Sequence, residues 1–463
     1  MNIKTLVLIF IKLILLCIMF SYYLSDDNDQ NIIAIFIILI FIINLYWIYY
    51  KFVRFKKDVL YPGFILSIAV MFWYTYPMII NYFNGGFCLW GEPFQSTCNK
   101  VENIIFTLIL VDLFCVFILL FDFLPLSLNL NKVINKTTFN VYYLYIIITA
   151  VMIYNVTMTG GFISILNKIM ISRSLGYEAS NLGNSDSFII ALLNALFVSA
   201  ILLLIYQTIT TWRLNSFQKN ILSICFIIIP VLYLTMISGN RSTIIMFMFP
   251  LILFYLYKRN GFKSFIKMML LLLGVFLFTQ VQLQSRNQGF ENLIDNGDFF
   301  TKNENFRVGI SSDFFSESLN SISHFDSSIL SMKQSQIYLF ITYPIPRYIF
   351  NNKPIPLATK DYTLYRWGLD ITKSSGNVFP GIVGQIYYNG FIFSLIEFIL
   401  IICFFIWLNK IVIRKMQMDT DASIFLYFIL YTVVFLSFRN FNPTLFLNYI
   451  LYVLLCVCFK KQD

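Results

Sequence analysis

Charge is scarce in this sequence of 463 residues, of which only 12% are Asp, Glu, Lys or Arg. Soluble domains carry roughly 25%, so the composition excludes a soluble globular protein. Histidine is scarcer still: His324 is the only one, and no Cys or His spacing typical of a metal site occurs. We therefore expect no metal ion and no cofactor.

Long apolar runs take the place of charge. Hydrophobic residues make up 59% of the chain, and the runs are about 20 residues long without alternating polarity, as transmembrane helices require. Backbone groups inside a bilayer must hydrogen bond within the protein. The sequence therefore predicts an all-α polytopic integral membrane protein with about twelve transmembrane helices. The predicted spans are 3–24, 31–50, 59–83, 104–124, 139–158, 187–211, 220–238, 243–257, 265–285, 379–408, 421–437 and 444–459.

The basic residues predict which side of the membrane each connection faces. Lys and Arg gather at both termini and in the short connections of one side, the pattern of cytoplasmic segments. The polar stretch 286–378 then lies outside, between a nine-helix region, 1–285, and a three-helix region, 379–463. The run 3–24 lacks a small-residue cleavage site, so we interpret it as a retained helix. The net charge of +10 reflects this topology and does not indicate nucleic acid.

The outer loop contains a stiff cationic segment, residues 342–356, with four prolines that hold the backbone extended. Arg347 and Lys353 project from it. A planar guanidinium together with an ammonium suits a diphosphate. The alternative is an ordinary Pro-rich surface turn. Two tight outer turns, at 238–242 and 438–443, add Arg241 and Arg439, for which general lipid-headgroup contact is the alternative.

The start of the tenth predicted span, residues 379–391, is rich in glycine. Two interpretations remain open. A broken helix would present backbone amides to an anion, whereas a continuous seam would let two helices pack closely.

Several ionisable side chains lie in unexpected places. Charges inside membrane spans are functional candidates by default, although some simply reach an interface. Those in or near spans are Lys12, Asp112, Asp122 and Glu397, of which Asp112 and Glu397 lie deeper and could line a cavity. His324 is a candidate general base because its pKa suits neutral pH, or an incidental loop histidine. Glu317 and Asp326 are weaker candidates. Cys88 and Cys98 flank an outer loop and could form a disulfide.

Three of these segments together resemble the Wzy family, the oligosaccharide repeat-unit polymerases of bacterial O-antigen and capsule assembly. The Ile-Pro-Arg…Lys-Pro stretch at 345–354 resembles the family's outer-loop motif. The stretch Pro-Gly-Ile-Val-Gly-Gln-Ile-Tyr-Tyr-Asn-Gly at 380–390 resembles its pre-helix signature, and Ser-Gly-Asn-Arg-Ser at 238–242 its Arg-bearing hairpin. Many members carry Glu where this chain has Gln385, so the resemblance assigns no acid–base role to that position.

The resemblance implies a glycosyltransferase in the bacterial inner membrane, with its active face in the periplasm. Its substrate would be an undecaprenyl-diphosphate-linked oligosaccharide. Membrane lipids, a chain-length regulator and a flippase would be its partners, with no nucleic acid. The expected diphosphate-binding residues are Arg173, Arg241, Arg286, Arg347, Lys353 and Arg439, and the expected catalytic residues are His324 and Arg347. The alternatives are a flippase for the same lipid-linked sugars and an O-antigen ligase, which transfers to a lipid A core.

Overall fold

The computed structural model describes most of the apolar segments of the chain. The described residues are 3–25, 29–55, 62–83, 100–119, 137–158, 161, 187–212, 216–238, 241–258, 314–325, 332–343, 345, 350, 354–367, 379–439, 441 and 443–460. Within them the regular structure is helical, with one isolated antiparallel bridge between Phe139 and Lys460. The helices are α1 (Ile3–Leu24), α2 (Gln30–Phe55), α3 (Gly63–Val70), the π-helix η1 (Met71–Thr75), α4 (Tyr76–Phe83), α6 (Val101–Leu119), α7 (Val141–Met158), α10 (Ser187–Thr211), α11 (Phe217–Ser238), α12 (Arg241–Lys258), α16 (Phe314–His324), α17 (Gln336–Thr342), α18 (Leu357–Trp367), α19 (Gly381–Tyr388), α20 (Phe391–Met416), α21 (Thr420–Ser437) and α22 (Pro443–Phe459).

The helices confirm an all-α, multi-pass membrane protein. In the described part of the chain, nine helical segments are long and apolar enough to cross a membrane, and two shorter apolar ones lie in α12 and α22. Each overlaps a predicted span. The remaining predicted span, 265–285, falls outside the described residues, so the total of about twelve stays a prediction. Apolar side chains such as Phe10, Ile35 and Ile146 are exposed, as expected of surfaces whose solvent is lipid.

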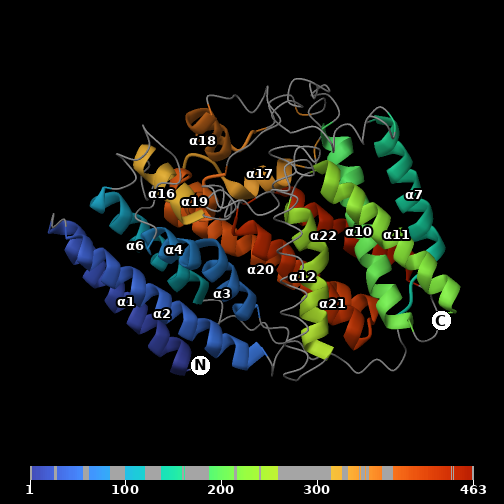
Figure 1. Ribbon diagram of the computed structural model, residues 1–463, viewed down its shortest axis with the longest axis horizontal. Coiled ribbons are helices and arrows are strands. Elements are labelled where there is room, and N and C mark those ends of the chain that lie inside the picture. Colours follow the sequence, from blue (N-terminus) through green and yellow to red (C-terminus); the bar gives the residue numbers. More distant parts are fainter. Residues whose placement is uncertain are drawn as a thin grey trace, which may run out of the picture. The chain divides into compact units, whose positions relative to one another are not determined.

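The chain forms two compact units that interleave along the sequence. The first comprises Met1–Leu128, Phe306–Trp407 and Val434–Pro443, and the second comprises Asn129–Asn305, Leu408–Val433 and Thr444–Asp463. In the first unit α1 packs along α6, and α16 packs along α19 (Figure 1). These units follow packing, whereas the division at residues 285 and 378 follows membrane topology and stays a prediction.

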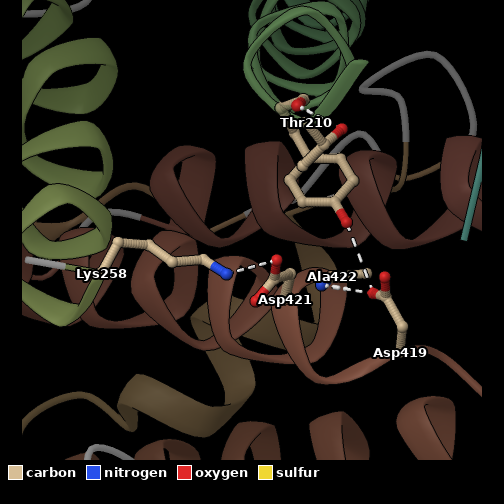
Figure 2. Close-up of polar contacts among 6 residues, drawn as sticks. Thr210, Lys258, Asp419, Asp421 and Ala422 are labelled. Atoms are coloured by element: carbon tan, nitrogen blue, oxygen red, sulfur yellow. Dashed lines mark hydrogen bonds and ion pairs between the residues drawn. The ribbon is translucent and has the colours of Figure 1, made fainter. Parts of the chain in front are cut away.

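One end of the second unit is held together by polar contacts. Lys258, in the last turn of α12, pairs with Asp421, in the first turn of α21, at 2.5 Å (Figure 2). Each charge also complements the dipole of its own helix. Asp419 caps α21 by accepting from the amide of Ala422 at 2.8 Å, and the hydroxyl of Tyr206 donates to the same carboxylate at 3.4 Å. These contacts fix α10, α12 and α21 at one end.

Candidate functional site

A break between two helices, α19 and α20, forms the centre of the candidate site. Asn389 and Gly390 separate the two helices, and Pro380 precedes α19. Gly381 and Gly390 have φ values of +72° and +96°, a left-handed backbone that glycine adopts without steric cost. The tenth predicted span is therefore a short buried helix followed by a long one.

Two glycines of α19 allow α16 to approach closely. A Cβ on Gly381 would lie 2.7 Å from the Oγ of Ser318, and a Cβ on Gly384 would lie 3.2 Å from the Cα of the same serine. The first amides of α19 are also occupied: Val383 donates to the Tyr74 hydroxyl at 3.1 Å, and Gly384 donates to the Ser318 Oγ at 3.2 Å. An anion would have to displace both hydroxyls, so these contacts support the close-packing interpretation of residues 379–391.

Arg439 lies in the tight turn that follows α21. Its guanidinium carbon is 5.7 Å from the centroid of the Phe314 ring and 5.3 Å from that of Phe379, so two aromatic rings favour one position of the cation. Tyr74, in the π-helix η1, donates to the carbonyl of Phe438 at 3.2 Å and so holds the turn. A planar guanidinium is in general well suited to a phosphate.

Buried amide side chains connect this turn with α17. The Oε1 of Gln385 accepts from the amide of Phe441 at 3.1 Å, and its Nε2 donates to the Oε1 of Gln336 at 3.2 Å. Both glutamines are buried. Because an amide does not titrate, Gln385 orients its neighbours and does not transfer protons.

Glu397 of α20 holds the beginning of α17. One carboxylate oxygen accepts from the hydroxyl of Ser335 at 2.6 Å, and the other accepts from the amide of Gln336 at 2.6 Å. The Ser335 hydroxyl in turn caps α17 by accepting from the amide of Tyr338. The sequence identified Glu397 as a deep charge but gave no sign of these partners, which lie about 60 residues earlier.

His324 ends α16 and stacks on Tyr365 of α18, with ring centroids 3.5 Å apart. Burial lowers its pKa below the ordinary value of 6.5, so the ring is neutral at neutral pH and can accept a proton. Phe314, which contacts Arg439, begins the same helix. At 1.5 Å per residue the two ends are about 15 Å apart, so His324 and Arg439 lie at opposite ends of α16.

A polar cluster around one carboxylate, Glu317, links α16 and α18. Glu317 accepts a hydrogen bond from the Tyr362 hydroxyl and pairs with Arg366 at 3.5 Å. Burial, and then the negative charge of Glu317, raise the pKa of Tyr362 well above its ordinary value, so this hydroxyl stays a donor. Glu317 is thus committed to partners inside the protein, which favours a structural role over proton transfer.

The other predicted site residues divide between the described and the remaining parts of the chain. Arg241 begins α12, as its tight turn predicted, and nothing further is described of its side chain. The site residues outside the described residues are Arg173, Arg286, Arg347 and Lys353, together with Asp122, Asp326, Cys88 and Cys98. Among the described residues no three His, Cys, Asp or Glu side chains group as metal ligands.

An ion pair inside the first unit was not foreseen from the sequence. Lys12 of α1 donates to Asp112 of α6, and both side chains are fully buried. Each charge alone is costly in a membrane, and the pairing offsets that cost. A hundred residues separate the partners, so no local spacing could have revealed them.

Comparison with known proteins gives no relative for the chain. No protein-family model, no curated protein and no solved structure matches it. Its function must therefore be argued from its own residues.

Proposed function

We propose that this protein polymerises lipid-linked oligosaccharide repeat units at the outer face of a bacterial cell membrane. The observation that carries the proposal is the contact between two of the segments singled out in the sequence. The turn that contains Arg439 bonds to Gln385 and packs on Phe379, both within the glycine-rich segment 379–391. A cation thus lies beside the segment that resembles the family's pre-helix signature.

In this reaction an acceptor hydroxyl attacks the anomeric carbon of the donor glycan. The new C–O bond forms as the bond to the diphosphate breaks, and polyprenyl diphosphate leaves with the electron pair. Arg439 stabilises the negative charge that develops on the leaving group, which is commonly the largest catalytic contribution. The other expected diphosphate-binding residues stay predictions: Arg173, Arg241, Arg286, Arg347 and Lys353. Neutral His324 is the candidate acceptor of the hydroxyl proton. Membrane anchoring holds both lipid-linked reactants in one plane.

Two other functions use the same ligand chemistry. A flippase would bind the same lipid diphosphate without forming a bond, and an O-antigen ligase would transfer the glycan once to a lipid A core. The stiff cationic segment 342–356 favours the polymerase over the ligase, and the extensive outer loop is not needed for flipping.

Purified protein in lipid nanodiscs, supplied with a synthetic undecaprenyl-diphosphate-linked repeat unit, discriminates among them. We expect a ladder of products that differ by one repeat unit. A single transfer to added lipid A core would establish a ligase instead. Unchanged substrate together with its movement across a vesicle membrane would establish a flippase.

A further inference from the structure

Glu397 is an acidic side chain on an otherwise apolar stretch of α20. Both of its carboxylate oxygens are used, one by Ser335 and one by the amide of Gln336, each at 2.6 Å. A carboxylate at a membrane helix is costly. A role beyond packing is therefore expected of it.

The segment that Glu397 holds, residues 334–336, is here named the loop clamp. Its first residue, Gln334, binds the far end of the Pro-rich segment: Nε2 donates to the carbonyl of Ile355 at 2.8 Å, and Oε1 accepts from the amide of Leu357 at 2.9 Å. Its last residue, Gln336, begins α17, which leads directly into that segment. α17 and residues 355–357 are thus both fixed to the loop clamp.

The loop clamp also reaches the turn that carries Arg439. Gln336 accepts from Gln385 at 3.2 Å, and Gln385 accepts from the amide of Phe441 at 3.1 Å. Gln336 and Gln385 are 2% and 1% exposed, so water does not compete for these bonds and the geometry is tightly determined.

We propose that Glu397 is a positioning residue that, through the loop clamp, sets the places of residues 355–357 and of the Arg439 turn together. It touches no substrate. It acts by keeping these two segments, separated by about 80 residues of chain, in one fixed arrangement. This inference rests on the proposed function for its catalytic consequence, but its structural consequence can be measured without any activity.

The structural test uses a single cysteine placed at Ile355, a half-buried position next to the loop clamp, in a chain whose own 8 cysteines are replaced. Maleimide labelling is timed in purified protein with Glu397, Glu397→Gln or Glu397→Ala. Glu102→Ala removes an exposed carboxylate from the first turn of α6 and is the matched control. We expect labelling about tenfold faster in Glu397→Ala, an intermediate rate in Glu397→Gln, which keeps one acceptor oxygen, and no change in Glu102→Ala.

Equal labelling rates for Glu397, Glu397→Gln and Glu397→Ala would overturn the inference. If Glu397→Ala does not accumulate in membranes, the labelling rate of Glu397→Gln is compared with that of the wild type instead, and equal rates would again overturn the inference. Repeat-unit transfer is then measured per mole of folded protein. A turnover reduced about tenfold or more with an unchanged unfolding temperature marks positioning, whereas a lower unfolding temperature with unchanged turnover marks a purely structural contact and overturns the proposal. Absence of transfer by the wild type would count against the proposed function and leave the labelling result standing.

Discussion

Arg439 is the residue on which the proposed chemistry can be tested most directly. Replacing Arg439 with Ala removes a charged hydrogen-bond donor worth about 1.5–3 kcal/mol, or roughly a 10- to 150-fold lower turnover if it acts in the transition state. Arg439→Lys should recover only part of this, because an ammonium lacks the planar fork and stacks less well on Phe314 and Phe379. The measurement is the product ladder formed by purified variants.

Two controls test whether the effect of Arg439→Ala reflects stabilisation of the leaving group. One removes a different positive charge, and the other removes the candidate general base. Lys100→Ala removes an exposed cation that is also predicted outside, and its ladder should match the wild type. His324→Ala should reduce turnover less than Arg439→Ala. A normal ladder for Arg439→Ala, with none for His324→Ala, would move the chemistry from the cation to the histidine.

The Lys12–Asp112 pair gives a prediction about stability. Asp112→Ala leaves a buried ammonium without its partner, which costs about 3–5 kcal/mol, whereas the double change Lys12→Met with Asp112→Leu should be close to neutral. Thermal unfolding of detergent-solubilised protein measures both. A double variant as unstable as Asp112→Ala would show that the pair does more than satisfy two charges.

At the scale of elements, close packing of α16 against α19 depends on glycine. Gly384→Ala brings a methyl group to within 3.2 Å of Ser318 Cα, and Gly381→Ala brings one to within 2.7 Å of Ser318 Oγ at a backbone φ of +72°. We expect a loss of about 1–3 kcal/mol for Gly384→Ala from crowding, and a larger loss for Gly381→Ala because backbone strain is added.

Gly161 is the matched control for this pair. It has a φ of +88°, and no atom of the described residues lies within 4 Å of its Cβ position, so among those residues Gly161→Ala measures backbone strain without crowding. Urea or heat unfolding of the three variants should rank Gly381→Ala as the least stable. A loss for Gly384→Ala no greater than that for an exposed helix substitution would show that the two helices do not need to be so close.

The elements also show what a sequence can and cannot predict here. The apolar runs predicted the helices because the length and apolar composition of a run are enough to match the bilayer core, whatever the rest of the chain contains. The glycines of 379–391 marked a special backbone but left open whether it served an anion or a helix contact. The answer lay in Tyr74 and Ser318, hundreds and tens of residues away. Partners such as Glu397 with Ser335 depend on tertiary packing in the same way.

At the scale of the whole molecule, several contacts join chain connections that are predicted to lie on the same side of the membrane. In the second unit, Asp419 donates through its amide to Thr137 at 2.9 Å, Asn140 donates to Phe459 at 3.0 Å, and Lys258 pairs with Asp421 (Figure 2). All of these positions border connections or a terminus predicted to be cytoplasmic from their Lys and Arg content.

The first unit has corresponding contacts among segments that are predicted to be outside. Asn81, at the end of α4, donates to Ser316 at 3.0 Å, and Arg439 contacts Phe314 and Phe379. Each of these lies at an end or a loop predicted to be outside. These contacts join segments that were separately predicted to be outside, as we expect if both lie on the same side of the membrane.

We therefore predict both termini inside and the loop 286–378 outside. A C-terminal reporter that is active only in the cytoplasm should be active, and the same reporter inserted near Asn296 should be silent. A reporter active only outside should give the reverse pattern. As a control, insertion after Lys258, which pairs with Asp421 at another helix end predicted to be cytoplasmic, should match the C-terminus. A silent C-terminal fusion with an active fusion near Asn296 would invert the topology, and Arg439 would then face the cytoplasm, where a periplasmic polymerase has no substrate.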